Sequence, residues 1–306
     1  MDFDCRVVAS GLQFPEGPCV LRDGSIAVAE VASGKAVRIS QDGRTSVIAD
    51  CGGGPSGLAV GPDANLYVCN SGGFGFRTEN GLMHPVMDAP VDYTGGLIQK
   101  IDLETGTCSI LYDSCNGEKL RAPNDLVFDR HGGFYFTDLG RMRTRDRDHG
   151  GVYYAKADGS AINEVAYKFL TPNGIGLSPD GAFLYVAETE TGRLWVFDVE
   201  GPGLVTKTKF PSRHGGRLLA DLPGYQRFDS LAIDAEGNIC VATLTSGRVS
   251  VFSPTGNLLH QVRTPDEATT NICFGGPDMR TAYVTYSSQG KLVAYEWDRP
   301  GLKLVH

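Results

Sequence analysis

Six polar residues recur at the same place in a pattern that is repeated along the chain. Each opens a short run of alternating apolar residues, and they are Glu16, Ser56, Asn124, Asn173, Asp229 and Asn271. Eight residues after each opening comes a turn position, occupied by Gly24, Ala64, Gly132, Gly181, Gly237 and Met279. Carboxylate and amide oxygens are the ligands that hard divalent cations prefer. If the fold brings these positions together, they are candidate metal ligands.

A simpler interpretation is that Asn, Asp and Ser at strand ends only form turns. That interpretation does not account for a glutamate at position 16, nor for amides and carboxylates at five of the six openings. Two carboxylates in one narrow channel repel each other unless a cation lies between them. None of the six histidines occupies an opening, which argues against a histidine-bound zinc. We therefore expect one bound divalent ion, Ca²⁺ in the first instance, with Mg²⁺, Mn²⁺ or Zn²⁺ as alternatives.

The elements that must position these residues are short strands. In the copy that spans residues 170–188, two strands of period two flank the turn Asp180-Gly181, a pattern typical of a β-hairpin. A third strand follows in every copy and a fourth in most. This pattern predicts an all-β fold, a six-bladed β-propeller of four antiparallel strands per blade, with two β-sandwiches as the alternative. We expect residues 1–306 to form a single domain, in which the strand at residues 5–9 closes the ring by pairing around residues 302–305.

In such a ring the first strand of each blade lines the central channel, so the six openings meet at one mouth. The second strands return to the same mouth and end at Glu30, Asn70, Asp138, Glu188, Thr243 and Tyr286. Among these residues and the openings, we expect Asn70, Asn124 and Asp138 to contact the substrate. The long connections 71–95, 114–122, 139–150 and 204–228 should wall this mouth. Arginines at positions 141, 143, 145 and 147 either give the wall positive charge or are simply solvated.

Composition excludes several classes of function. The net charge is −8 and the chain has no run of basic residues, which argues against partners such as nucleic acid or an anionic membrane. The N-terminal residues lack the pattern of a signal peptide, and the eight cysteines form no Cys-x-x-Cys pair. Reduced cysteines and a cytoplasmic location are therefore expected, with a small molecule as the partner. The oligomeric state is left open.

Six motifs together resemble the SMP-30/gluconolactonase family, which includes regucalcin. They begin at Phe14-Pro-Glu-Gly-Pro, Ala122-Pro-Asn-Asp, Phe136-Thr-Asp, Thr171-Pro-Asn-Gly, Phe228-Asp-Ser-Leu and Thr270-Asn-Ile-Cys, and so cover nearly the whole chain. The resemblance implies a six-bladed propeller with one divalent metal in its channel. It also implies that Glu16, Asn173 and Asp229 are metal ligands and that Asn124 lies beside the metal, either as a ligand or through the substrate.

The activity implied by this resemblance is the hydrolysis of sugar lactones. The metal would polarise the carbonyl group, and Asp229 would act as the catalytic general base on a water molecule or as a nucleophile. The sequence therefore predicts a metal-dependent hydrolase that opens a small cyclic ester. The alternatives are a hydrolase of a cyclic diketone or an organophosphate, a calcium-binding propeller without catalytic activity, and a scaffold that binds partners on its flat face.

Overall fold

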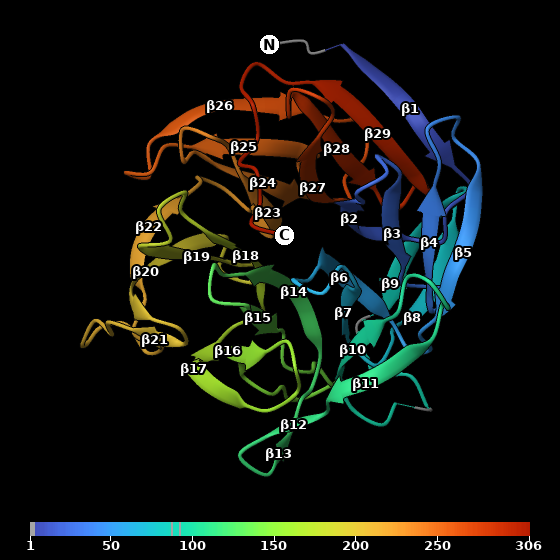
Figure 1. Cartoon of the computed structure of the whole chain (residues 1–306). Coiled ribbons are helices and arrows are strands. Elements are labelled where there is room, and N and C mark those ends of the chain that lie inside the picture. The colour runs from blue at the N-terminus through green and yellow to red at the C-terminus, as the bar shows by residue number, and fades with distance from the viewer. Residues whose placement is uncertain (1–3, 87, 92) are drawn as a thin grey trace.

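The regular structure of the chain consists of strands and turns. The computed structural model describes residues 4–86, 88–91 and 93–306, and the elements within these ranges are β-strands. Most of them form six antiparallel sheets arranged around a central axis, and two further pairs of strands form small hairpins; the C-terminus lies near the axis and β1 at the periphery (Figure 1). Among the described residues, no helix has the length and apolar character needed to cross a membrane.

Each sheet is a blade whose first strand is the innermost one. From the inside outwards, the first blade contains β2 (Pro15–Val20), β3 (Ile26–Glu30), β4 (Lys35–Ile39) and β5 (Thr45–Asp50). The second contains β6 (Pro55–Val60), β7 (Leu66–Asn70), β10 (Leu97–Ile101) and β11 (Cys108–Tyr112). The third contains β14 (Pro123–Phe128), β15 (Gly133–Asp138), β16 (Gly150–Lys156) and β17 (Ile162–Phe169). The inner strands contact one another in ring order, β2 with β6 and β6 with β14.

The last three blades follow the same order. The fourth contains β18 (Pro172–Leu177), β19 (Phe183–Glu188), β20 (Arg193–Gly201) and β22 (Arg217–Asp221). The fifth contains β23 (Arg227–Ile233), β24 (Ile239–Leu244), β25 (Arg248–Phe252) and β26 (Leu258–Arg263). The sixth contains β27 (Thr269–Gly275), β28 (Thr281–Tyr286), β29 (Lys291–Glu296) and β1 (Cys5–Ser10). The inner strands β14, β18, β23, β27 and β2 contact one another in turn, so the ring is closed. The predicted six-bladed propeller is confirmed.

The turn chemistry explains the hairpins that begin each blade. Between β18 and β19, Asp180 accepts hydrogen bonds from Ser178 Oγ and from the Ala182 amide, while Gly181 takes a φ of 73°. Such a left-handed residue suits a tight turn between antiparallel strands. The strand β19 is then buried on both faces, since Leu184 and Val186 pack in one core cluster and Tyr185 and Ala187 pack in the next. The hydrophobic core of the molecule therefore lies between adjacent blades.

The N-terminal strand closes the ring, as predicted, but its expected partner was wrong. β1 pairs with β29 from Cys5–Tyr295 to Ser10–Lys291 and becomes the outermost strand of the last blade. β29 is the third strand of that blade and offers a free edge, whereas the chain turns inwards after Pro300. The Leu302 amide then donates to the Ile233 carbonyl oxygen at 2.9 Å, and residues 302–306 cross the end of the channel.

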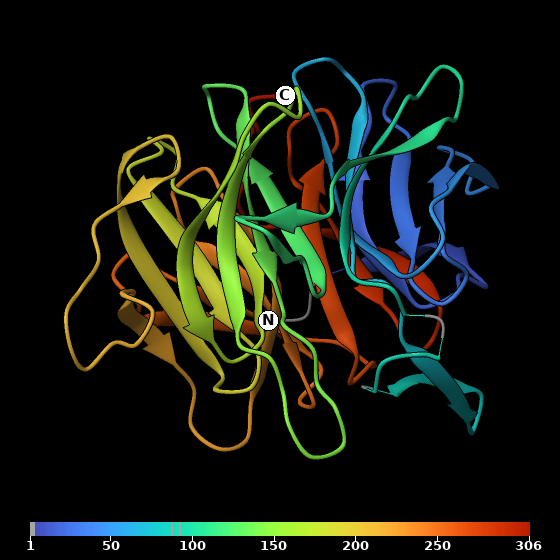
Figure 2. The ribbon, with the colours of Figure 1, turned by 90° about the horizontal axis from the view of Figure 1, so that it is seen from below.

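Most of the long connections lie at the mouth where the inner strands begin. The connection after β7 contains the hairpin of β8 (Gly75–Glu79) and β9 (Leu82–Val86), and the connection before β14 contains β12 (Ser114–Cys115) and β13 (Glu118–Lys119). In Figure 2 the teal β8–β9 hairpin projects at the end of the channel opposite to the C-terminus. The prediction for 204–228 was wrong in part. That segment contains β21 (Leu204–Val205) and the fourth strand β22, so residues 206–216 turn at the far end.

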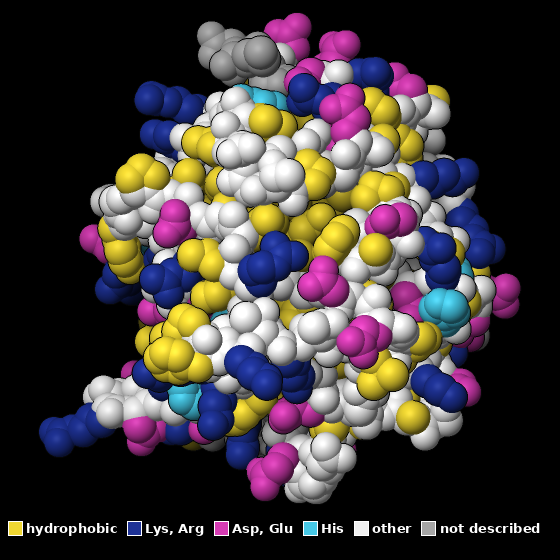
Figure 3. All heavy atoms as spheres, turned by 90° about the vertical axis from the view of Figure 1, so that its left-hand side faces the viewer, with side chains coloured by type: hydrophobic (Ala, Val, Ile, Leu, Met, Phe, Trp, Pro, Cys, Tyr) yellow, Lys and Arg dark blue, Asp and Glu magenta, His cyan; other side chains and the backbone are white. Residues whose placement is uncertain are grey.

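The outer surface carries no obvious clustering of charge on the side that faces the viewer in Figure 3. Basic, acidic and apolar side chains are interspersed there over the outer strands of the fourth and fifth blades.

Candidate metal and active site

The six polar openings form one buried layer at the beginning of the inner strands. Their exposed fractions lie between 3 % and 8 %. Two hydrogen bonds link side chains of this layer across neighbouring blades, and a third joins Asn173 to Ser230, the residue that follows Asp229. Asn271 Nδ2 donates to Glu16 Oε2 at 3.0 Å, Asn124 Nδ2 donates to Ser56 Oγ at 3.3 Å, and Ser230 Oγ donates to Asn173 Oδ1 at 3.3 Å. The convergence of the six openings, on which the metal hypothesis depends, is thus present in the fold.

Glycine residues allow the inner strands to approach so closely. A Cβ atom on Gly174 would lie 2.7 Å from the carbonyl oxygen of Asp229, and one on Gly57 would lie 2.5 Å from that of Asn124. Both distances are far below ordinary van der Waals contact. Each of these glycines directly follows an opening residue, so the small residue at that position is what lets the polar side chains crowd into one channel.

The two carboxylates of the layer are in an unfavourable environment. Burial raises the pKa of Glu16, and the hydrogen bonds from Asn271 and the Gly17 amide only partly oppose this effect. Burial also raises the pKa of Asp229 well above its ordinary range, and the negative charge of Glu16 raises it further. Arg227 and Asn173 act in the opposite direction. A divalent cation between the two carboxylates would remove this repulsion and keep both groups ionised.

The donor set fits such a cation. Asn124 Oδ1 is a buried oxygen without a hydrogen-bond partner, and leaving such an atom unsatisfied is costly. Glu16 and Asp229 supply the charge that balances a dication, and Asn173 supplies a second amide oxygen. In the part of the chain that the structure describes, no three His, Cys, Asp or Glu side chains are grouped as metal ligands. A site in this channel would therefore need amide oxygens as well as the two carboxylates, as Ca²⁺ sites often do.

Asp125 is a candidate residue that the sequence patterns did not single out. It follows Asn124, and at this second position of the inner strands the other five blades have Gly17, Gly57, Gly174, Ser230 and Ile272. Burial, and then the charge of Glu16, raise the pKa of Asp125 to about 7. The sequence did contain a signal for Asp125, because this position of the repeat holds one acid whereas the other five copies have small or apolar residues there. Asp125 adds a third carboxyl group directly below the layer.

The side chains at the ends of two second strands hold backbone segments in place. Asp138 accepts hydrogen bonds from the amides of Arg121, Ala122 and Gly140 at 2.7–2.9 Å. Asn70 Oδ1 accepts from the Gly54 and Gly72 amides, while its Nδ2 donates to the Gly52 carbonyl oxygen at 2.8 Å. These contacts fasten the segments that lead into β14 and β6. They occupy the polar atoms of both side chains, so a substrate-binding role for Asn70 and Asp138 stays a prediction that these contacts do not favour.

The same kind of hydrogen bond, from a backbone amide to the side chain at the end of a second strand, occurs in two other blades. Glu30 Oε1 accepts from the Gln13 amide at 3.1 Å, and Glu188 Oε1 accepts from the Leu170 amide at 2.6 Å. In each case the acceptor fastens the residue that lies three positions before an opening residue. In four of the six blades, the side chain at the end of the second strand therefore holds the segment that leads into the opening residue.

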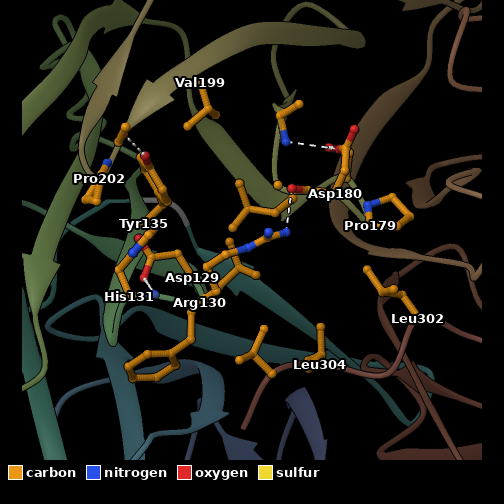
Figure 4. Close-up of a pocket in the computed structure, with 18 of the residues that line it drawn as sticks. Asp129, Arg130, His131, Tyr135, Pro179, Asp180, Val199, Pro202, Leu302 and Leu304 are labelled. Carbon is orange, nitrogen blue, oxygen red and sulfur yellow. Dashed lines mark hydrogen bonds between the residues drawn. The ribbon is translucent and has the colours of Figure 1, made fainter.

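Two cavities lie at the far end of the channel from this layer. The one drawn in Figure 4, of about 330 Å³, is lined by residues of the β14–β15 and β18–β19 turns, such as His131 and Asp180, together with Leu302 and Leu304. The other, of about 540 Å³, fills the channel between Asp125 and the C-terminal residues and is lined mainly by apolar side chains. The larger cavity reaches the polar layer from behind, since Asn271 is among the residues that line it.

Comparison with known proteins agrees with this geometry. Residues 14–288 match the family described as the SMP-30/Gluconolactonase/LRE-like region. A gluconolactonase of Zymomonas mobilis is 26 % identical over 298 residues, which cover 88 % of this chain and 75 % of the relative. A protein of Staphylococcus haemolyticus named lactonase drp35 is 30 % identical over 262 residues, or 85 % of this chain and 72 % of that protein.

Solved structures show the same fold. A calcium-binding protein, regucalcin, of Agrobacterium tumefaciens superimposes with a TM-score of 0.76 at 20 % identity and covers 99 % of both chains. A gluconolactonase of Xanthomonas campestris gives a TM-score of 0.75 at 22 % identity, with 95 % of this chain and 89 % of the other covered.

Proposed function

The chain belongs to the SMP-30/gluconolactonase/LRE-like family, and from this premise we propose that it hydrolyses a small lactone with the help of one bound divalent metal ion. The relatives named gluconolactonase and lactonase, which align with most of the chain, support a carboxylic ester hydrolase of this kind. The description of a structural neighbour as calcium-binding supports Ca²⁺ as the ion.

The buried polar layer is the observation that supports a bound metal ion. Glu16 and Asp229 lie in it, and within the described ranges neither forms an ion pair with a lysine or arginine at 4.0 Å or less. Asn124 contributes a buried oxygen with no partner. We propose that Glu16, Asn124, Asn173 and Asp229 hold the ion, because two acids and two amides match both the charge and the hardness of a divalent cation.

A bound dication would act as a Lewis acid towards the ester carbonyl group of the lactone. Asp229 removes a proton from a water molecule, and the water oxygen forms a bond to the carbonyl carbon. The bond between that carbon and the ring oxygen then breaks, and the proton passes to the departing oxygen. The product is the ring-opened hydroxy acid, so atoms and charge balance with one water consumed.

The neighbouring residues orient these groups. Asn271 donates to Glu16 and thereby fixes the direction of its carboxylate. Ser230 donates a hydrogen bond to Asn173 Oδ1, which restricts the rotation of the Asn173 amide group. Asn124 can serve the metal, the substrate or both. Asn70 and Asp138 hold the segments that carry Ser56 and Asn124.

A panel of lactones, followed by proton release, tests the activity. The protein is first stripped of metal with EDTA and then assayed with Ca²⁺, Mg²⁺, Mn²⁺ or Zn²⁺ added back. We expect no turnover without metal and recovery with at least one ion.

Two outcomes would contradict different parts of this proposal. Full activity after chelation would remove the metal from the mechanism. Metal binding without turnover of any lactone would favour the calcium-binding function for which the regucalcin neighbour is described.

A further inference from the structure

Arg141 is a buried arginine at the mouth of the channel. Only 2 % of it is exposed, and it lies in the connection between β15 and β16. Its guanidinium group stands between two aromatic rings, 4.8 Å from the centre of Phe74 and 4.4 Å from the centre of Tyr93. Its Nη2 donates to the carbonyl oxygen of Gly73. The cation is thus held by one backbone oxygen and two π-faces.

The hydrogen bonding of this cation is incomplete. Nε and Nη1 of Arg141 are both buried and have no hydrogen-bond partner. Among the ion pairs of the described residues, none involves Arg141. An arginine stays charged in a protein, and burying a charge without a counter-charge is costly. The charge of Asp138 acts on Arg141, but the Asp138 oxygens accept from backbone amides. The three unused N–H groups on Nε and Nη1 therefore point to a further anionic partner that is absent from the described residues.

The location of Arg141 connects it to the proposed site. Gly73, which accepts its hydrogen bond, packs on Gly53 and Gly54, the residues that lead into Ser56. Ser56 in turn accepts from Asn124 in the polar layer. The guanidinium group therefore joins the mouth connections of the second and third blades, beside the segment that leads into Ser56.

Two other arginines of the same connection behave differently, whereas Arg147 is half-buried, donates to Thr171 Oγ1 and also has a buried Nε without a partner. Arg143 is exposed and pairs with Asp146 and Asp148. Arg145 is also exposed. For these two, the solvated interpretation of the arginine run holds. It fails for Arg141, which the fold buries without an ion pair at 4.0 Å or less among the described residues.

We propose that Arg141 binds a carboxylate carried by the substrate, so that the preferred lactone is one with a second, free acid group away from the ester. This inference rests on the proposed lactonase function and specifies its substrate class. The carboxylate would accept the N–H groups that the chain leaves unused, and charge-assisted hydrogen bonds of this kind are short and strong. Phe74 and Tyr93 are each only partly buried, and binding requires one of these rings to turn aside.

The test compares two substrates that differ in one group. The γ-lactones of D-gluconate and D-glucarate share the same ring, but one carries a terminal hydroxymethyl group and the other a terminal carboxylate. We expect the wild-type protein to have a kcat/KM at least about tenfold higher for the carboxylated lactone, the factor that one charged hydrogen bond typically supplies. In Arg141→Gln this preference should disappear, so that the ratio of the two kcat/KM values falls to about one. Arg141→Lys keeps the charge and should retain part of the preference.

Arg145→Gln is the matched control, since it removes an exposed arginine from the same connection and should leave the preference unchanged. A merely structural Arg141 would instead lower the melting temperature and both kcat/KM values together, without altering their ratio. That result would overturn the inference, as would a wild-type protein that does not prefer the carboxylated lactone.

Binding measurements separate this inference from the proposed function. Calorimetric titration with the ring-opened acids, D-gluconate and D-glucarate, requires no turnover and no variant that folds poorly. We expect the wild-type protein with Ca²⁺ to bind the dicarboxylate at least about tenfold more tightly. Equal affinities would refute the role of Arg141 even if lactones are hydrolysed. A preference for the dicarboxylate without hydrolysis of either lactone would refute the lactonase function and leave the Arg141 site standing.

Discussion

Glu16 and Asp229 are acids from the first and fifth blades that the fold buries in one channel. Burial raises the pKa of each, and the charge of Glu16 raises that of Asp229 further. A structural role alone would be served better by neutral side chains, because buried like charges destabilise a fold. Their presence is therefore best explained by a bound cation.

Asp229→Asn tests this explanation at a single residue. We expect kcat for the best lactone to fall by about 10²–10⁴-fold, the usual contribution of a general base. The metal-free variant should be at least as stable to heat as the metal-free wild type, because one of two repelling carboxylates is gone. Kinetics by proton release and a thermal melt in EDTA provide the two readouts.

Asp221→Asn serves as the control, because this aspartate is exposed at the end of β22. It should leave both readouts unchanged. An Asp229→Asn protein with wild-type kcat would show that Asp229 is not the base.

The residues of the polar layer could be predicted from the sequence because a constant offset of eight residues marks them. Asp125 and Arg141 could not be placed with the same certainty. The importance of Asp125 depends on the glycine and serine residues that other inner strands carry at the same position. The importance of Arg141 depends on Phe74 and Tyr93, which are far away in sequence and enclose it. Such contacts between blades are not encoded in any local pattern.

The inner strands depend on the glycine that follows the opening residue. In Gly174→Ala the new Cβ would lie 2.7 Å from both Asp229 O and Leu231 N, and these are backbone atoms that cannot move aside cheaply. We expect the free energy of unfolding to fall by about 3 kcal/mol or more, at the upper end of overpacking effects. Urea unfolding followed by fluorescence measures the change.

Gly201→Ala is the control for that substitution. Gly201 is the last residue of β20, and no atom lies within 4 Å of the position that the new methyl group would take. The free energy of unfolding should therefore change by less than about 0.5 kcal/mol. If Gly174→Ala is equally harmless, the inner strands are not packed as tightly as described.

His214 makes the stability of the fourth blade depend on pH. It stacks on Phe169 at 3.8 Å, and burial lowers its pKa from 6.5 to about 4. For a depressed pKa the stabilisation is complete above pH 6.5 and is lost as the pH falls towards 4. We expect this one group to account for a loss of about 2 kcal/mol between roughly pH 6.5 and pH 5.

Urea unfolding of wild type and His214→Phe at the two pH values measures that contribution. The variant keeps an aromatic ring against Phe169 but cannot be protonated, so its stability should fall less on acidification. If the free energy of unfolding depends on pH in the same way in both proteins, His214 is neutral, or accessible to water, in both the folded and the unfolded state.

The regular strands were predictable from alternation and turn residues, whereas the outer edges of two blades were not. β22 follows a connection of eleven residues after β21, and no turn signal of the repeat announces it. β1 belongs to the last blade although it lies at the other end of the chain, and its partner β29 could only be identified from the closed ring. Long-range pairing of this kind leaves little local trace.

At the scale of the whole molecule, the closing strand joins the two ends of the chain into one ring. We propose that residues 1–306 form one domain, because each blade covers its neighbours and β1 covers the last free edge. A truncation that removes residues 1–10 would expose the edge of β29. We expect its melting temperature to fall by about 5 °C or more, measured by calorimetry.

Removal of Lys303–His306 provides the matched truncation at the other end. These residues lie across the far end of the channel, behind the polar layer, so kcat/KM should be unchanged. A large loss of activity would mean that substrate enters, or product leaves, through the end that the C-terminal residues cover.

The central claim is that the polar layer binds a divalent ion, and anomalous diffraction from a crystal grown with Mn²⁺ tests it most directly. We predict one strong anomalous peak with oxygen atoms of Glu16, Asn124, Asn173 and Asp229 at about 2.1–2.6 Å, the range of hard-cation coordination. A well-ordered crystal of active protein with no peak among these four side chains would contradict the account.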